Sequence, residues 1–107
     1  MGDVIEVDPI ELQSLLTSGA IRTLIDVRTT WERDLARLYN SRLLDDDSME
    51  EFAALEKCTP IAFYCHHGIR SRAAAMFFVQ QGFTKLYNLT GGIEAWSQLV
   101  DPDVPRY

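Results

Sequence analysis

Short apolar runs alternate with helical patterns along this chain, and this alternation limits its possible folds more than any other feature. Apolar runs of four or five residues are typical of buried strands, whereas apolar residues spaced three and four apart are typical of helices. Regular alternation of the two favours a parallel sheet with helices packed on both of its faces. We therefore predict an α/β fold with a central parallel sheet of about five strands.

The pattern also places the individual elements. Strands are expected at 4–7, 23–27, 41–44, 60–64 and 85–89, and helices from Pro9 to before Gly19, at 30–38, 48–56, 71–81 and 93–99. Asp8 with Glu11, and Asp47 with Glu50, have the spacing of helix capping boxes. The three adjacent carboxylates at 45–47 lack the alternate spacing of a calcium loop, so we interpret them as a solvated turn.

Size and composition set the class of protein. The 107 residues correspond to one domain, expected over 1–107, and no apolar run approaches the roughly 18 residues that cross a membrane. A net charge of −6 argues against a nucleic-acid partner. We expect a cytoplasmic protein whose two cysteines are reduced thiols. Its large apolar residues are assigned to the core: Trp31, Phe77, Phe78 and Trp96.

The charges are distributed unevenly. Residues 57–93 contain no acidic residue, although they contain both histidines and four cationic side chains: Lys57, Arg70, Arg72 and Lys85. A cationic segment inside an acidic chain suggests a site for a small anion. The apolar character of the same segment would explain the missing acids equally well, so charge alone leaves both interpretations open.

The predicted strand at 60–64 leads directly into a loop and a helix, through the sequence Cys65-His66-His67-Gly68-Ile69-Arg70-Ser71. Gly68 lets the backbone curl, so that successive amide N–H groups can face inward and bind an anion. The amino end of the following helix adds partial positive charge. These surroundings favour a thiolate, and we predict that the pKa of Cys65 lies below the ordinary value of about 8.5.

The second cysteine and the two histidines are not assigned to the chemistry. Cys58 precedes Thr59-Pro60, with no glycine loop and no helix start, and is interpreted as structural. His66 and His67 could act as acid or base, but we favour a role in shaping the entrance to the loop. No fourth ligand accompanies Cys65 and the two histidines, so neither a metal site nor a cofactor is predicted.

The loop resembles the active loop of rhodanese-like domains, which has the pattern Cys-x-x-Gly-x-Arg-Ser/Thr. Three further segments are similar to the family in the expected order: Val7-Asp8-Pro9-Ile10-Glu11-Leu12, Leu24-Ile25-Asp26-Val27-Arg28 with Trp31-Glu32, and Tyr87-Asn88-Leu89 with Gly91-Gly92-Ile93 and Ala95-Trp96. The resemblance covers nearly the whole chain. It implies a rhodanese-like fold and a sulfurtransferase that moves sulfur from a donor such as thiosulfate to a thiol or protein acceptor.

The resemblance also implies roles for individual residues. Cys65 would be the nucleophile and would carry the sulfur as a persulfide. The substrate-binding cradle would be the backbone of His66, His67, Gly68, Ile69 and Ser71, with Arg70 positioning the anion. Asp26 and Arg28 would brace the loop, although a purely structural ion pair between them is an equally good interpretation.

One stretch departs from the family pattern. Where the family often has Gly-His-Ile-Pro-Gly-Ala, this chain has Ala36-Arg37-Leu38-Tyr39-Asn40-Ser41. Leu38 keeps an apolar anchor, so we expect the fold to survive. The local turn and the rim of the site are the features that the departure affects.

Two other functions remain open at this stage. Cysteine phosphatases and arsenate reductases also hold an oxyanion over a cysteine, but they place five residues between cysteine and arginine, whereas four separate Cys65 from Arg70. The smaller ring suits a sulfur atom better than a tetrahedral phosphate. A third possibility is a non-enzymatic partner module of a sulfur pathway, against which the intact cysteine and arginine argue.

Overall fold

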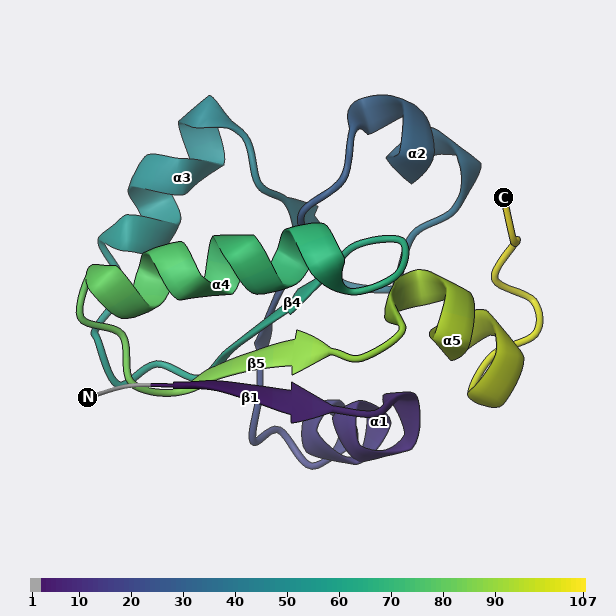
Figure 1. Ribbon diagram of the computed structural model, residues 1–107, viewed down its shortest axis with the longest axis horizontal. Coiled ribbons are helices and arrows are strands. Elements are labelled where there is room, and N and C mark those ends of the chain that lie inside the picture. The colour runs from purple at the N-terminus through teal and green to yellow at the C-terminus, as the bar shows by residue number, and fades with distance from the viewer. Residues whose placement is uncertain (1–2) are drawn as a thin grey trace.

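The computed structural model describes residues 3–107, within which five strands and five helices alternate (Figure 1). The strands are β1 (Val4–Val7), β2 (Thr23–Asp26), β3 (Ser41–Leu43), β4 (Ile61–Tyr64) and β5 (Leu86–Leu89). The helices are α1 (Pro9–Thr17), α2 (Thr30–Leu35), α3 (Asp46–Ala53), α4 (Ile69–Gln80) and α5 (Gly92–Leu99). All strand pairs are parallel, in the order β1-β5-β4-β2-β3, which confirms the predicted sheet.

The central strand β4 is buried on both faces of the sheet. Ile61 and Phe63 point into the apolar cluster beneath α3 and α4, while Ala62 and Tyr64 point into the cluster beneath α1 and α5. Successive side chains of a strand alternate between faces, so a strand between two helical layers needs apolar residues at every position. This explains why 60–64 is a continuous apolar run, and it confirms helices on both faces.

Several helix boundaries differ from the predictions, and those of α2 and α3 differ most. The helix predicted for 30–38 ends at Leu35, because Ala36 takes an extended conformation. The helix predicted for 48–56 begins at Asp46, so the expected Asp47–Glu50 capping box is wrong. Asp45 caps this helix instead, and its carboxylate accepts a hydrogen bond of 2.8 Å from the amide of Ser48. Several adjacent aspartates can each cap a helix, and spacing alone cannot choose among them.

The first helix agrees more closely with the sequence. The Asp8–Glu11 capping box is present, and Pro9 occupies the first helical position. The helix predicted to begin at Ser71 starts two residues earlier, at Ile69, with Gly68 as its N-cap in the left-handed region at φ 99°. This earlier start places the amide of Ser71 in the first turn, where N–H groups have no partner within the helix.

Two of the four large residues assigned to the core are on the surface. Phe78 is buried and Trp96 partly buried, but Phe77 is 45% exposed and Trp31 is 66% exposed. Adjacent helical residues point about 100° apart, so a helix that packs on one side rarely buries both. The neighbours of these two residues, Phe78 and Glu32, are the ones that face inward.

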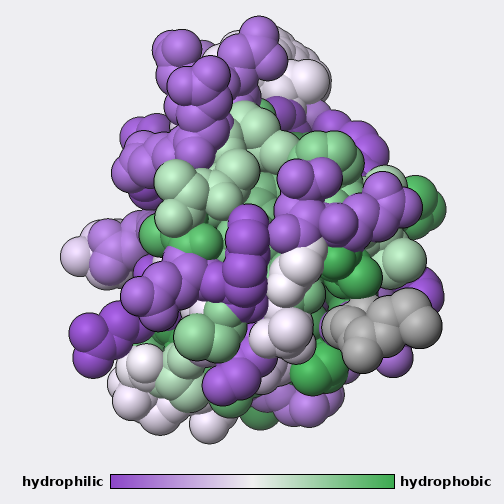
Figure 2. Space-filling view, turned by 90° about the vertical axis from the view of Figure 1, so that its left-hand side faces the viewer, coloured by the Kyte–Doolittle hydropathy of each residue, from purple (hydrophilic) through white to green (hydrophobic). Residues whose placement is uncertain are grey.

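The end of the molecule opposite the Cys65 loop, where α3 and α4 finish, mixes apolar and hydrophilic side chains (Figure 2). Every helix within residues 3–107 is too short or too polar to span a bilayer.

Candidate active site

Cys65 follows the last residue of the central strand β4, and the loop that it begins is held by the first turn of α5. The amide of Ile93 donates to the carbonyl of Cys65 at 2.9 Å, and the amide of Glu94 donates to that of His66 at 3.2 Å. A Cβ atom on Gly92 would lie 2.3 Å from the His66 carbonyl oxygen and 2.5 Å from that of Cys65. Only glycine therefore permits this close approach between loop and helix.

Three hydrogen-bonding groups converge on the sulfur of Cys65. The amide of Gly68 lies 3.1 Å from Sγ, the amide of Ser71 lies 3.4 Å from it, and the Ser71 hydroxyl oxygen lies 3.3 Å from it. The left-handed backbone of Gly68 turns its N–H inward, and the first turn of α4 supplies the other amide. Within the described residues, the amides of Ile69 and Arg70 make no hydrogen bond to this sulfur, so the donor set is smaller than the sequence suggested.

These contacts determine the ionisation of Cys65. Burial acts to raise the pKa of the thiol, but hydrogen bonds from Ser71 and Gly68 favour the thiolate and outweigh burial. The pKa of Cys65 therefore lies below its ordinary value, in the predicted direction. These contacts thus favour the thiolate form of Cys65.

An ultraviolet titration of the thiolate will measure this shift. We expect a midpoint lower in folded Cys58→Ala protein than in the same protein unfolded in urea, where an ordinary thiol titrates near about 8.5. Because the folded pKa is depressed, thiolate persists in the folded protein at pH values where the unfolded chain is protonated, and it is lost as the pH falls through the folded midpoint. The Cys58→Ala/Cys65→Ala double variant supplies the background from tyrosine. A folded midpoint equal to or above the unfolded one contradicts this account.

The predicted nucleophile is the buried cysteine, and the cysteine interpreted as structural is the exposed one. Cys58, interpreted as structural, is exposed, whereas Cys65 is 1% exposed. Cys58 lies in the short connection before β4, where no packing surface covers it. Cys65 is buried, and its sulfur contacts polar groups of its own loop and of the first turn of α4.

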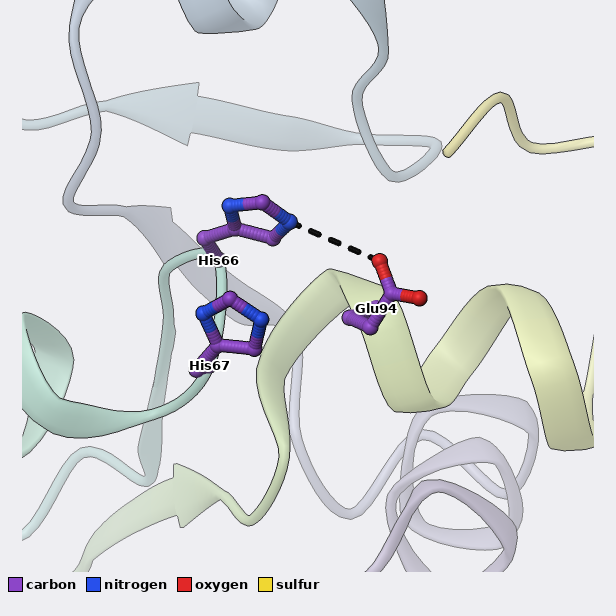
Figure 3. Close-up of side chains that lie close together, drawn as sticks. All are labelled: His66, His67 and Glu94. Atoms are coloured by element: carbon purple, nitrogen blue, oxygen red, sulfur yellow. Dashed lines mark ion pairs between the residues drawn. The ribbon is translucent and has the colours of Figure 1, made fainter. Parts of the chain in front are cut away.

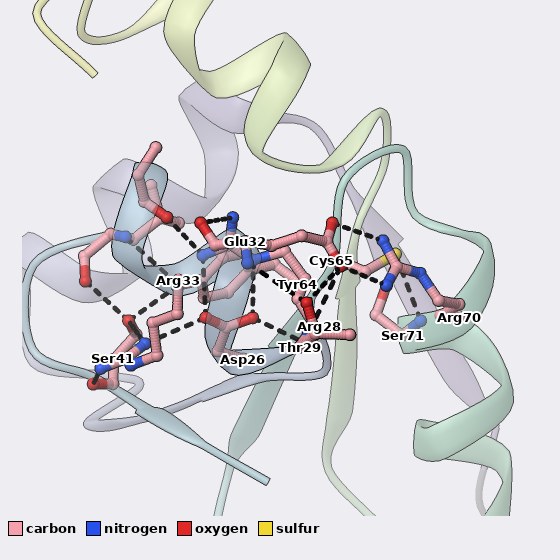
Figure 4. A network of polar contacts seen from close by, with 12 residues as sticks. Asp26, Arg28, Thr29, Glu32, Arg33, Ser41, Tyr64, Cys65, Arg70 and Ser71 are labelled. Carbon is pink, nitrogen blue, oxygen red and sulfur yellow. Dashed lines mark hydrogen bonds and ion pairs between the residues drawn. The ribbon is translucent and has the colours of Figure 1, made fainter. Parts of the chain in front are cut away.

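A buried ion pair lies at the carboxyl end of β2 (Figure 4). Arg28 donates two hydrogen bonds to the carboxylate of Asp26, at 2.8 and 2.9 Å, and both side chains have no exposed surface. Arg28 also donates to the carbonyl of Ala36 and to the hydroxyl of Tyr107. Arg33 adds a second cation at 3.0 Å from Asp26. The pair thus joins β2 to three other parts of the chain.

Arg70 is held by a carboxylate on a neighbouring helix. Its guanidinium donates to both oxygens of Glu32, at 2.7 and 2.9 Å, and the Tyr107 hydroxyl donates to Glu32 at 2.6 Å. These contacts lower the pKa of Glu32, while burial and the bond to Glu32 raise the pKa of Tyr107 to about 12. The resting Arg70 side chain is directed at Glu32, and its expected role toward an anion stays a prediction.

The two histidines lie at the rim of the loop, beside Glu94 (Figure 3). Their rings stack on each other with centroids 4.0 Å apart, and His66 also stacks on Tyr107 at 4.1 Å. Buried Nε2 of His66 lies 3.5 Å from a Glu94 oxygen without a hydrogen bond, and Glu94 is paired with Arg106. One ligand atom from each of His66, His67 and Glu94 lies within 4.8 Å of the other two, so these three side chains are grouped closely enough to hold a metal ion.

The stretch at 36–41, which departs from the family pattern, keeps its apolar anchor. Leu38 is buried as expected, and its amide donates to the Tyr64 hydroxyl at 3.2 Å. Asn40 adopts the left-handed region at φ 60°, which asparagine tolerates better than most residues. The carbonyl of Ala36 accepts a hydrogen bond from Arg28 at 2.6 Å.

Three polar residues around the loop are not among the site residues predicted from the sequence. Asn88 is buried on β5 and bonds both Ser71 and the carbonyl of Gly68, while Glu6 contacts Asn88 from β1. Tyr107 contacts Glu32 and Arg28. The sequence does contain one indication of this network, because Asn88 is a polar residue within an otherwise apolar strand.

Comparison with known proteins places these features in a family. Residues 8–99 match the sequence profile of the rhodanese-like domain. A thiosulfate sulfurtransferase, GlpE, from Pseudomonas paraeruginosa is 34% identical over 96 residues, which span 89% of this chain and 86% of the relative.

Solved structures share the fold. A rhodanese-like domain protein from Staphylococcus aureus superimposes with a TM-score of 0.76 at 22% identity, covering 97% of this chain and 99% of the other. The human single-domain sulfurtransferase TSTD1 gives a TM-score of 0.75 at 22% identity, covering 91% of this chain and 98% of the other.

Proposed function

This chain belongs to the rhodanese-like family and is an enzyme of the rhodanese type, and we propose that it transfers sulfane sulfur as a persulfide on Cys65. The observation that carries this proposal is the convergence of the Gly68 and Ser71 amides on a buried sulfur. Fixed N–H dipoles in a site with little water stabilise negative charge without reorganising. The same dipoles serve a thiolate before the reaction and a persulfide after it.

The first half-reaction loads the sulfur. The Cys65 thiolate attacks the outer sulfur of thiosulfate and forms a new S–S bond. The original S–S bond of the donor breaks, and sulfite leaves with the electron pair. Cys65 then carries one added sulfur atom, whose negative charge lies on the terminal sulfur and faces the helix end.

The second half-reaction unloads it. A thiophilic acceptor, such as cyanide, a small thiol or a protein cysteine, attacks the terminal sulfur. The bond between the two sulfurs breaks, and Cys65 leaves as a thiolate. A depressed thiol pKa assists this step, because a more stable thiolate is a better leaving group.

Side chains at the rim of the loop and charged residues near Cys65 also have roles in the proposed reaction. Cys65 is enclosed, so the donor reaches it when the rim formed by His66, His67 and Tyr107 moves. Arg70 attracts the anion while its pairing with Glu32 fixes its position, and the Asp26–Arg28 pair braces the loop from β2. We place the reaction in the cytoplasm, where both cysteines stay reduced.

Steady-state kinetics with thiosulfate and cyanide test this function. Because sulfite leaves before the acceptor reacts, we expect ping-pong behaviour, with parallel double-reciprocal lines as cyanide is varied at several thiosulfate concentrations. Intersecting lines, or no thiocyanate above the rate without enzyme, count against the persulfide route. Hydrolysis of an aryl phosphate that is lost in Cys65→Ser would instead favour the phosphatase alternative.

A further inference from the structure

Asn88 is a buried polar residue with a fixed side-chain orientation. It is 1% exposed, and its Nδ2 lies 3.0 Å from the carbonyl oxygen of Gly68 and 3.0 and 3.1 Å from the two carboxylate oxygens of Glu6. All of these neighbours are acceptors, so the NH₂ group must occupy this position. The Asn88 oxygen therefore faces Ser71, whose hydroxyl donates to it at 2.6 Å.

The Ser71 hydroxyl thus has two competing acceptors. Its oxygen lies 2.6 Å from Asn88 Oδ1 and 3.3 Å from Sγ of Cys65. A hydroxyl carries a single proton, so it can donate fully to one of them at a time. While the proton points to Asn88, the hydroxyl offers Cys65 a lone pair, which suits a thiol that donates its own proton.

Ionising Cys65 disturbs this arrangement. If the Ser71 proton stays with Asn88, the hydroxyl presents a lone pair to the thiolate. If the proton turns to Sγ, it leaves the buried Asn88 oxygen without a donor, which is costly in the interior. In both cases the Asn88 oxygen makes the bare thiolate less stable than it would be if the Ser71 hydroxyl were free to donate to it.

A loaded Cys65 does not incur this cost. In the persulfide, the sulfur attached to the cysteine carbon has two covalent bonds and the charge lies on the outer sulfur. The Ser71 proton can remain on Asn88 without facing an anionic Sγ. We propose that Asn88 is a positioning residue that, by holding the Ser71 proton, favours the sulfur-loaded form of Cys65 over the empty thiolate. This consequence for loading rests on the proposed persulfide chemistry, whereas the effect on ionisation does not.

Other charged groups surround Cys65, and the substitution of Asn88 leaves them unchanged. Arg70 faces the loop from α4, paired with Glu32 of α2, and His66 and His67 lie in the loop itself. Glu94 of α5 lies beside His66. At the end of β2, Asp26 and Arg28 neutralise each other's charge. Arg72 of α4 lies 3.8 Å from Glu6. None of these groups competes for the Ser71 proton.

Removing the competing oxygen tests the proposal. We expect Asn88→Leu to lower the pKa of Cys65 by about one unit, the scale of a hydrogen bond to an ionised group. A merely structural role predicts the opposite direction, because loosening Gly68 would weaken the amide cradle. In a Ser71→Ala background no proton is available for competition, and Asn88→Leu should then cause no fall.

Thr90→Val is the matched control. The Thr90 hydroxyl donates to Glu6 at 2.9 Å but does not reach Ser71, so this variant perturbs the same carboxylate without releasing the proton. Its Cys65 pKa should equal that of the wild type. A pKa that is unchanged or raised in Asn88→Leu, or one that falls equally in the Ser71→Ala background, overturns the proposal.

A measurement on wild-type protein covers the case in which Asn88→Leu does not fold. The carbonyl ¹³C shift of the Asn88 side chain should follow the titration of Cys65, because its hydrogen bond from Ser71 weakens as the thiolate forms. The shift should be independent of pH over the same interval in Cys65→Ser. A wild-type shift that stays constant through the Cys65 titration contradicts the proposal.

The loading equilibrium separates this inference from the proposed function. At a fixed ratio of thiosulfate to sulfite and a pH above both thiol midpoints, the persulfide-to-thiolate ratio should fall about tenfold in Asn88→Leu. A wild type that takes up no sulfur defeats the proposed function but leaves the pKa comparison valid. A wild type that loads normally, with the same ratio in the variant, defeats the inference alone.

Discussion

We expect Cys65→Ser to abolish sulfur transfer from thiosulfate to cyanide while leaving the protein folded. Serine fits the same space and accepts the same hydrogen bonds from Gly68 and Ser71, so the free energy of unfolding should change by no more than about 1 kcal/mol. A hydroxyl, however, is not ionised near neutral pH and cannot hold sulfane sulfur. Loss of a nucleophile of this kind lowers turnover by about 10³-fold or more.

Cys58→Ser is the control for that experiment. Cys58 is exposed and has none of the contacts that converge on Cys65, so this variant should retain wild-type turnover. Thiocyanate formation, measured colorimetrically, reports both results. Activity that survives in Cys65→Ser and disappears in Cys58→Ser would show that the loop is not the reactive centre.

Asp26→Ala should cause the largest loss of stability among single substitutions near the site. The Asp26–Arg28 pair is completely buried, and removal of the carboxylate leaves a guanidinium in the interior without its main counter-charge. Breaking one partner of such a pair costs about 3–5 kcal/mol. Urea unfolding monitored by tryptophan fluorescence or circular dichroism measures this difference.

An exposed ion pair provides the matched control. Arg42 and Glu51 form two hydrogen bonds of 2.7 and 2.8 Å, but their side chains are 52% and 59% exposed. Glu51→Ala should therefore leave the urea midpoint close to that of the wild type, because water solvates the remaining arginine. Equal losses in Asp26→Ala and Glu51→Ala would mean that burial of the first pair does not determine its contribution.

Local features of the sequence were sufficient to predict the fold and the position of the loop. The apolar run before Cys65 and the glycine three residues after it identify a strand, a tight turn and a helix start, because each depends on neighbours in the chain. Alternation of such units then implies the parallel sheet. The capping box at Asp8 was likewise predictable, since its two partners are three residues apart.

Contacts between distant residues could not be predicted in this way. Glu6 and Asn88 are 82 residues apart, and they meet because β1 and β5 pair in register. Glu32 and Arg70 are 38 residues apart and come from different helices. No spacing rule connects such pairs, so the pairing of Arg70 and the acceptor for Ser71 are apparent only in three dimensions.

Exposure was the other feature that the sequence could not assign. Cys58 and Cys65 both lie near strand β4, and residue type does not distinguish the covered thiol from the open one. Trp31 shows the same limit, because the polar Glu32 beside it takes the inward position to hold Arg70 and Tyr107. A polar network can thus reverse the burial order that hydrophobicity predicts.

Intact-mass spectrometry after exposure to thiosulfate tests the central claim most directly. Wild-type protein and Cys58→Ala should each gain the mass of one sulfur atom, and cyanide should remove it, while Cys65→Ala should gain nothing. Sulfur that loads onto Cys65→Ala, or wild-type protein that gains no mass, would contradict persulfide formation at Cys65.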